Sequence, residues 1–368
     1  MGSDNTTTYW DYLRIADLLG LQGGVGGDES SISDDELHFI VVHQTYELWF
    51  KVVLRELRTA RNRLLREMVS EEEIPRVVSG LDRINTILQL AVTQFDAMET
   101  LSPQGFLAFR DDLVPASGFQ SHQMREIEIL LGLPEEKRLE YDGSDPLDHI
   151  KKLAKHSLGG KPAWKGIKAA RREPTIKEAL EGWLYRTPIR GSRPDQADDD
   201  DVVEAFLADC LKGVRDHHEK LVNRMVAIRG ASPERIEERF RSVLDQVRTF
   251  LAADDLDEEH RLRVRRIRAA ILFIESYREL PLLAWPRALL DRVVTMEQRF
   301  IIWRSRHARM VERMIGRRVG TGGSSGVDYL DETTKYRIFT DLWAVRTMLL
   351  PQELRPEIPN AEKYGFRD

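Results

Sequence analysis

Two of the nine histidines lie on apolar faces of predicted helices, where a side chain could do chemistry inside the protein core. His43 shares its face with Phe39 and Tyr46, and His307 lies four residues after Trp303 on another helix. A single inward histidine is most often a core residue whose hydrogen bonds are satisfied. Two inward histidines on different helices are typical of a haem pocket, in which one imidazole ligates the iron. Periodicity alone leaves both interpretations open.

A third candidate is Arg110, which lies four residues after Phe106 and so shares its helical face. A guanidinium beside an aromatic ring could bind a carboxylate through two parallel hydrogen bonds, while the ring packs against the rest of a ligand. An ion pair within the protein is the simpler interpretation. The spacing does not decide between them.

The segment 320–326 reads GTGGSSG and directly follows the predicted helix that carries His307. No Gly-Lys-Ser/Thr follows it, so it is not a nucleotide-binding P-loop. Four glycines with hydroxyl neighbours can direct backbone N–H groups at an anion such as a carboxylate. A flexible connection between two helices is an equally good interpretation of this composition.

Other metal chemistry has little support in the sequence. The single cysteine, Cys210, excludes a disulfide framework within the chain and any cysteine-based zinc or iron–sulfur site. The histidine spacing matches no zinc motif. Two carboxylate-x-x-His pairs, Asp35 with His38 and Asp257 with His260, resemble half of a di-iron site. Such sites normally use glutamate, and neither pair lies on a clean apolar stripe, so we disfavour this reading.

The elements that must position these residues are almost all helices, because apolar residues recur at three- and four-residue spacing along most of the chain. No strand pattern and no internal repeat is evident. The sequence therefore predicts an all-α fold, a helical bundle. The predicted helices span residues 34–68, 72–99, 103–113, 117–132, 174–186, 201–228, 232–252, 256–281 and 286–316.

Composition shifts divide the chain into three parts. Residues 1–33 are expected to form an N-terminal arm whose Gly- and Ser-rich end, 21–33, is a flexible linker. Residues 34–350 form the helical domain, within which 134–200 reads as a polar, variable insertion. Residues 351–368 contain three prolines and are expected to be a surface tail.

The overall composition excludes several classes of function. Of 368 residues, 42% are hydrophobic and 32% are charged, which is an ordinary soluble balance. No run approaches the ~18 apolar residues of a membrane span, and the N-terminus lacks the pattern of a secretory signal. These features predict a cytoplasmic protein that does not interact with membranes. The net charge of −6 gives no electrostatic support for binding nucleic acid.

Six strings, in this order, together resemble the tryptophan 2,3-dioxygenases, the haem-dependent enzymes that open the indole ring of L-tryptophan. The resemblance covers most of residues 8–133 and 285–350, and its combination of motifs is highly specific. The strings are YWDYLR (9–14), DELHFIVVHQTYELWFK (35–51), FLAFRD (106–111), PASGFQS (115–121), WRSRH (303–307) and GTGGSSG (320–326).

The resemblance implies a role for each matching residue. His307 would be the axial ligand of a b-type haem, and His43 would contact the indole N–H of the substrate. Arg110 would bind the carboxylate of the substrate, and Thr321 would contact its amino-acid end. The resemblance also makes residues 34–350 the haem-binding catalytic domain. The implied reaction consumes O2 and L-tryptophan and yields N-formylkynurenine.

The resemblance further implies that Phe39 and Phe106 line the substrate pocket. Tyr9 and Tyr12 would reach into the site of a neighbouring subunit, because family members are helical homotetramers. Position 106 is Phe where some relatives have Tyr, and the segments 21–33 and 134–200 depart from the family pattern.

These departures keep two other functions open. The chain could be a related oxygenase that inserts one oxygen atom into a tryptophan derivative, giving an oxindole-type product. It could also be a haem-binding protein without catalysis, although the presence of Arg110, Thr321 and His43 together argues against that.

Overall fold

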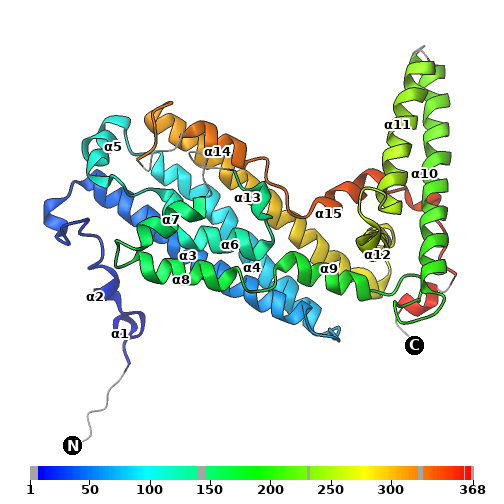
Figure 1. The fold of residues 1–368 in the computed structure, drawn as a ribbon, viewed down its shortest axis with the longest axis horizontal. Helices are drawn as coiled ribbons and strands as arrows, with labels where there is room; N and C mark the ends of the chain where they lie inside the picture. The colour runs from blue at the N-terminus through cyan, green and yellow to red at the C-terminus, as the bar shows by residue number, and fades with distance from the viewer. Residues whose placement is uncertain (1–6, 140–145, 230–232, 322–325, 360, 366–368) are drawn as a thin grey trace, which may run out of the picture.

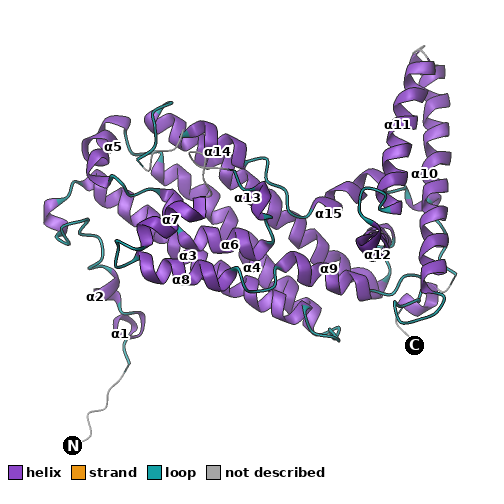
Figure 2. Cartoon of the chain, in the orientation of Figure 1, coloured by secondary structure: helices purple, strands orange, loops and turns teal. Residues whose placement is uncertain are grey.

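The computed structural model describes residues 7–139, 146–229, 233–321, 326–359 and 361–365. Within these residues every regular element is an α-helix or a short 3-10 helix, and the only β-type pairing is an isolated bridge between Ile189 and Ser192. Figure 2 shows the same all-helical chain. The predicted all-α class is confirmed. No helix of the described residues is long and apolar enough to cross a membrane.

Three long helices form the centre of the bundle and carry both candidate histidines (Figure 1). They are α3 (Asp34–Leu64), α4 (Glu73–Met98) and α13 (Ala284–Ile315), and α4 packs against both of the others. The Ser33 side chain caps α3 by accepting a 3.1 Å hydrogen bond from the Glu36 backbone N–H. Gly316 ends α13 with a φ of 60°, a conformation that favours glycine.

Shorter elements close the two sides of this centre. These are α5 (Pro103–Phe109), a 3-10 turn (Arg110–Leu113), α6 (His122–Leu131) and α14 (Val327–Thr333). The helix predicted over 117–132 is a 3-10 turn (Gly118–Gln120) followed by α6, because the Ser121 side chain caps the new helix at the Met124 N–H. The remaining helices are α1 (Tyr9–Leu13), α2 (Ile15–Leu18), α7 (Pro146–Ala154), α8 (Gly160–Ala170), α9 (Ile176–Arg186), α10 (Asp199–Arg229), α11 (Pro233–Ala252), α12 (Glu258–Ser276) and α15 (Thr340–Ala344).

Figure 1 shows that α10 and α11 form a hairpin that projects from one end of the molecule, while α1 and α2 lie outside the bundle near the other end. The C-terminal residues pack on α12 and the loop before α10. The Tyr277 hydroxyl donates to the Pro356 carbonyl over 2.7 Å, and the Tyr364 hydroxyl accepts from the Gly191 N–H over 2.7 Å. The tail therefore follows the surface, anchored by these hydrogen bonds.

Residues 134–200 differ from the polar insertion that their composition suggested. They contain α7, α8 and α9, of which α8 packs against α6 and α9 packs against α3. Ile167, Leu180 and Trp183 are among their buried side chains and belong to the main hydrophobic core. The apolar residues are spaced at helical intervals among many charges, so a low average hydropathy conceals a buried face.

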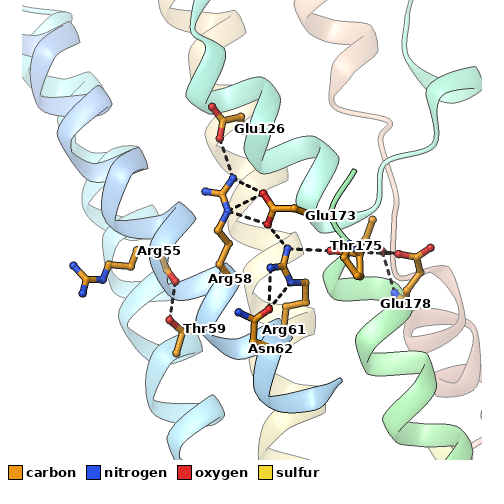
Figure 3. Close-up of polar contacts among 10 residues, drawn as sticks. Arg55, Arg58, Thr59, Arg61, Asn62, Glu126, Glu173, Thr175 and Glu178 are labelled. Carbon is orange, nitrogen blue, oxygen red and sulfur yellow. Dashed lines mark hydrogen bonds and ion pairs between the residues drawn. The ribbon is translucent and has the colours of Figure 1, made fainter. Parts of the chain in front are cut away.

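An ion-pair network joins α3, α6 and the loop before α9 (Figure 3). Glu173 accepts hydrogen bonds from Arg58 at 2.9 Å and from Arg61 at 2.5 Å, and Arg58 also pairs with Glu126 at 3.1 Å. Burial by itself raises the pKa of Glu173. The hydrogen bonds and charges of the two arginines outweigh that effect and hold its pKa below the usual value.

We expect Glu173→Gln to lower the free energy of unfolding by about 2–3 kcal/mol at pH 7, because the buried Arg61 loses its charged partner. The depressed pKa means that the wild type has this stabilisation above the unfolded-state pKa near 4.5 and loses it as the pH falls through the folded-state pKa. Denaturant unfolding should therefore show the difference between wild type and variant shrinking below pH 4.5. Glu135→Gln, which breaks an exposed pair with Arg171, should cost less than about 0.5 kcal/mol. Equal effects of both substitutions would contradict a structural role for the network.

Candidate active site

Both candidate histidines line one cavity of about 240 Å3 in the centre of the bundle. Its walls come from α3, α4, α5, α6, α13 and α14 and from the loops beside them. Besides His43 and His307, the wall includes Phe39, Phe106, Arg110, Met124, Arg125, Glu128, Trp303, Arg304, Thr321 and Tyr329. Six of the eight residues proposed from the sequence therefore meet at one site, from segments up to 282 positions apart (321 − 39).

The His43 imidazole is held by its own helix. Its Nδ1 lies 2.8 Å from the Phe39 carbonyl oxygen, and its ring centroid lies 4.0 Å from that of Phe39. Because a carbonyl can only accept, Nδ1 carries the hydrogen, and the lone pair of Nε2 is left to accept a hydrogen bond. Burial lowers the pKa of His43, although the Phe39 carbonyl and the Glu47 charge oppose the shift. The ring is therefore a neutral acceptor.

The His307 imidazole lies one helical turn after Trp303 on α13 and is nearly parallel to the Phe95 ring, with centroids 5.8 Å apart. Burial lowers its pKa to about 4, and the nearby His43 and Arg125 add to the shift. A neutral imidazole is the form that ligates a metal, because protonation would occupy the lone pair. His307 thus has the protonation state that an axial haem ligand needs.

Arg110 and Thr321 lie together where the Gly-rich segment meets the residues after α5. The Arg110 side chain donates from Nη2 to the Val319 carbonyl over 2.5 Å, and its buried Nε forms no hydrogen bond within the described residues. The Thr321 hydroxyl donates to the Ala116 carbonyl over 2.7 Å. Residues 322–325 of the Gly-rich segment lie outside the described residues. The arrangement leaves a cationic donor at the cavity wall for an anion.

Three phenylalanines pack together beside Arg110, and two of them, Phe39 and Phe106, line the cavity. The Phe39 centroid lies 5.6 Å from that of Phe106 and 5.5 Å from that of Phe109, and the last two are 5.4 Å apart. Such a wall suits a flat aromatic ligand. The site thus combines a guanidinium with an aromatic wall, which is the chemistry of an aromatic amino acid.

The site also contains a buried charge cluster that the sequence did not reveal. The Glu128 carboxylate bridges Arg125 at 2.8 Å and Arg304 at 2.7 Å. All three residues line the cavity, and their side chains are at most 11% exposed. Two guanidinium groups share one carboxylate, so the cluster carries one excess positive charge. Charged residues three apart on a helix normally indicate a solvent-exposed face, so spacing alone could not find this cluster.

These residues fit a haem group. The buried Arg125 and Arg304 share the single Glu128 carboxylate, which leaves one excess positive charge at the cavity wall. Haem b carries two carboxylates, and this excess charge would match one of them. The donor set therefore suits a porphyrin held by His307.

Other sequence candidates lie elsewhere in the structure. Tyr9 and Tyr12 are 71% and 78% exposed and do not line the cavity of their own chain. His38 is bonded to the Ala97 carbonyl at 2.9 Å, and His260 to Asp257 at 2.7 Å. Among the described residues no group of three or more metal-ligating side chains occurs, so the disfavoured di-iron reading gains no support.

Comparison with known proteins gives a consistent result. The sequence profile of the family described as tryptophan 2,3-dioxygenase matches residues 1–349. A tryptophan 2,3-dioxygenase of Sorangium cellulosum is 45% identical over 98% of this chain and 87% of its own length. Tryptophan 2,3-dioxygenase 2 of Ralstonia nicotianae is 44% identical over 98% of both chains. A tryptophan 2,3-dioxygenase-like protein of Xanthomonas campestris is 47% identical over 72% of this chain and 98% of its own length. The chain therefore belongs to the tryptophan 2,3-dioxygenase family.

Proposed function

We propose that this protein is a haem-dependent dioxygenase that cleaves the C2–C3 bond of the indole ring of L-tryptophan with O2, giving N-formylkynurenine. One observation carries the proposal beyond family membership. A single cavity contains two neutral histidines, a guanidinium beside an aromatic wall, and two buried arginines that share one carboxylate. A porphyrin bound together with an aromatic amino acid would use all of these groups.

In this proposal His307 would ligate the haem iron, and Arg125 would pair with a haem carboxylate. Ferrous haem supplies the binding and activation of O2 when it is present. The role of the protein is then to hold the porphyrin, exclude water and position the substrate. The excess charge of the cluster of Arg125, Glu128 and Arg304 offsets part of the cost of burying a carboxylate.

The substrate is held at both ends. Arg110 pairs with the carboxylate of tryptophan, which compensates for removing that charge from water. Thr321 contacts the amino-acid end of the substrate, and Phe39 and Phe106 pack against the indole ring. His43 accepts the indole N–H at Nε2, because Nδ1 is already committed to the backbone. The ring itself is the nucleophile, so no residue must act as a general base.

The N-terminal arm, residues 7–21, completes the site across subunits in our proposal. Tyr9, Trp10 and Tyr12 are 64–78% exposed, which is costly for three aromatic side chains so close together. We propose that a homotetramer covers them and places Tyr9 and Tyr12 over the substrate pocket of a neighbouring chain. The single, buried Cys210 suits a reducing compartment, and we assign the protein to the cytoplasm.

The decisive test is the product formed from L-tryptophan under 18O2 by the haem-loaded, reduced protein. We expect a product that has gained two labelled oxygen atoms, detected by mass spectrometry. A gain of one atom would indicate the oxindole-type oxygenase instead. Haem uptake without consumption of tryptophan or its derivatives would indicate a non-catalytic haem protein, and either result would overturn the proposal.

A mixing experiment tests the shared site. Tyr12→Ala and His307→Ala proteins should each be nearly inactive, but co-expressed mixed oligomers should recover up to about a quarter of the wild-type activity per chain, because random pairing gives that share of sites both residues. Activity is measured as the absorbance of the formylated product. Mixed oligomers that form but stay as inactive as the separate variants would show that each site belongs to one chain.

A further inference from the structure

Gln22 is buried within a segment that is otherwise largely exposed. Only 7% of Gln22 is accessible, whereas the neighbouring Leu21 and Val25 are 64% and 92% exposed. The Gln22 side-chain amide donates to Gln44 Oε1 over 2.7 Å and to the Leu18 carbonyl over 3.0 Å. Because the polar Gln22 side chain is buried while neighbouring apolar side chains are exposed, its hydrogen bonds rather than the hydrophobic effect account for its burial.

Gln44 returns the interaction. Its side-chain amide donates to the Leu21 carbonyl over 2.9 Å, so each glutamine donates toward the segment that carries the other. We call this pair of side chains the glutamine clasp. Gln44 lies on α3 directly after His43, so the clasp fixes the arm to the same helical turn that carries His43.

The chain after the clasp makes a tight turn that only glycine permits. A Cβ on Gly23 would lie 2.3 Å from the Gly27 carbonyl carbon and 2.5 Å from the Asp28 nitrogen. Gly24 has a φ of 60°, which other residues rarely adopt. The Asp28 carboxylate accepts from the Ser30 N–H at 3.0 Å. Residues 23–30 belong to the linker that was expected to be flexible. They form a compact turn with a defined path, which we call the elbow.

Together the clasp and the elbow determine where the arm leaves the bundle. Figure 1 shows α1 and α2 outside the body of the molecule, beyond the start of α3. The arm presents Tyr9, Trp10 and Tyr12 to solvent in this position. Without the clasp, the arm could sample many directions, and that freedom would be lost whenever it docked on another chain.

We propose that Gln22 and Gln44 are positioning residues that preorganise the N-terminal arm for docking on a second copy of this chain. The inference rests on the proposed shared site, and it adds a mechanism by which the arm is delivered to it. Gln44 acts through the arm and not through the neighbouring His43. Neither glutamine touches the substrate.

The test compares Gln22→Ala, Gln44→Ala and the double variant in the haem-loaded full-length protein. Two neutral hydrogen bonds correspond to about a tenfold change in an equilibrium constant, so Gln44→Ala, which removes both bonds between α3 and the arm, should raise KM for L-tryptophan about tenfold and leave kcat within about twofold. Gln22→Ala leaves the bond from Gln44 to the Leu21 carbonyl and should raise KM about threefold. The double variant should match Gln44→Ala, because that substitution alone already opens the clasp. Gln246→Ala, on the exposed face of α11, is the matched control and should change nothing.

Two further measurements separate this role from general structural damage. Trypsin should cleave after the exposed Arg14 about tenfold faster in the clasp variants, while haem content and the Soret band stay as in the wild type. In a Tyr9→Ala/Tyr12→Ala background, where turnover is expected to be nearly lost, Gln44→Ala should have no added effect on the Kd for L-tryptophan measured from the change in the Soret band. An added effect there would mean that Gln44 acts on the pocket directly and would overturn the proposal, as would additive single effects. If the wild type has no tryptophan turnover, the proposed function fails, whereas the cleavage rate still tests the clasp.

Discussion

The His307→Ala variant is expected to emerge from purification without bound haem, whereas His43→Ala is expected to retain it. His307 is the one neutral imidazole on the α13 wall of the cavity, and its pKa of about 4 keeps the lone pair free at neutral pH. In the proposed haem protein, removing it would leave the iron without its protein ligand. The Soret absorbance per chain after gel filtration measures the loss.

The His43→Ala variant is the matched control for this prediction. It removes an imidazole from the same cavity, but one whose Nδ1 is bonded to the backbone of α3. We expect a normal haem content and a reduced or redirected turnover, because the indole N–H loses its acceptor. A His307→Ala protein that still shows five-coordinate, histidine-ligated haem would remove the axial assignment.

The second large effect is expected for Arg110→Ala, which should raise KM for L-tryptophan by at least about 100-fold. Leaving a buried charge unpaired costs about 3–5 kcal/mol, and each 1.4 kcal/mol is a factor of ten. The Arg110 side chain is only 17% exposed, so water can replace it poorly. Steady-state kinetics at constant haem content give the value.

Tryptamine, which lacks the carboxylate, distinguishes a carboxylate clamp from a packing role. Its KM should be nearly the same in the wild type and in Arg110→Ala, since no charge is left unpaired. Arg110→Lys should recover part of the affinity for tryptophan, because it keeps the charge but loses the planar pair of donors. If tryptophan and tryptamine lose affinity equally, Arg110 is not the clamp.

The long helices were predictable because their apolar stripes run over many turns. The helix ends predicted from the stripes of α3, α4 and α13 lie within four residues of the ends in the structure. The helices α7, α8 and α14 were not predicted. Each has at most eleven residues, and α8 contains a proline and two glycines, so local composition favours a loop. Only packing against α6 and α13 shows that α8 and α14 are needed to close the bundle.

The candidate site was partly predictable for the same reason. Periodicity predicted that His43 and His307 face the core, whereas their proposed roles and those of Arg110 and Thr321 needed the family resemblance. The buried cluster around Glu128 could not be found, because a charged residue is ordinarily assigned to the surface. The cluster is buried because α6 and α13, which are far apart in the sequence, meet in the fold, as the 2.7 Å contact between Arg304 and Glu128 shows.

In the proposed haem protein, that cluster would also link the stability of the chain to the supply of its cofactor. Without the porphyrin, two guanidinium groups share a single carboxylate in an apolar interior, and the surplus cation destabilises the folded state. An anionic ligand that binds only the folded form removes this penalty and shifts the unfolding equilibrium by mass action. If the proposed haem binding holds, we expect the haem-free chain to unfold at a lower denaturant concentration than the haem-loaded chain, and its yield from cells to rise with the supply of porphyrin.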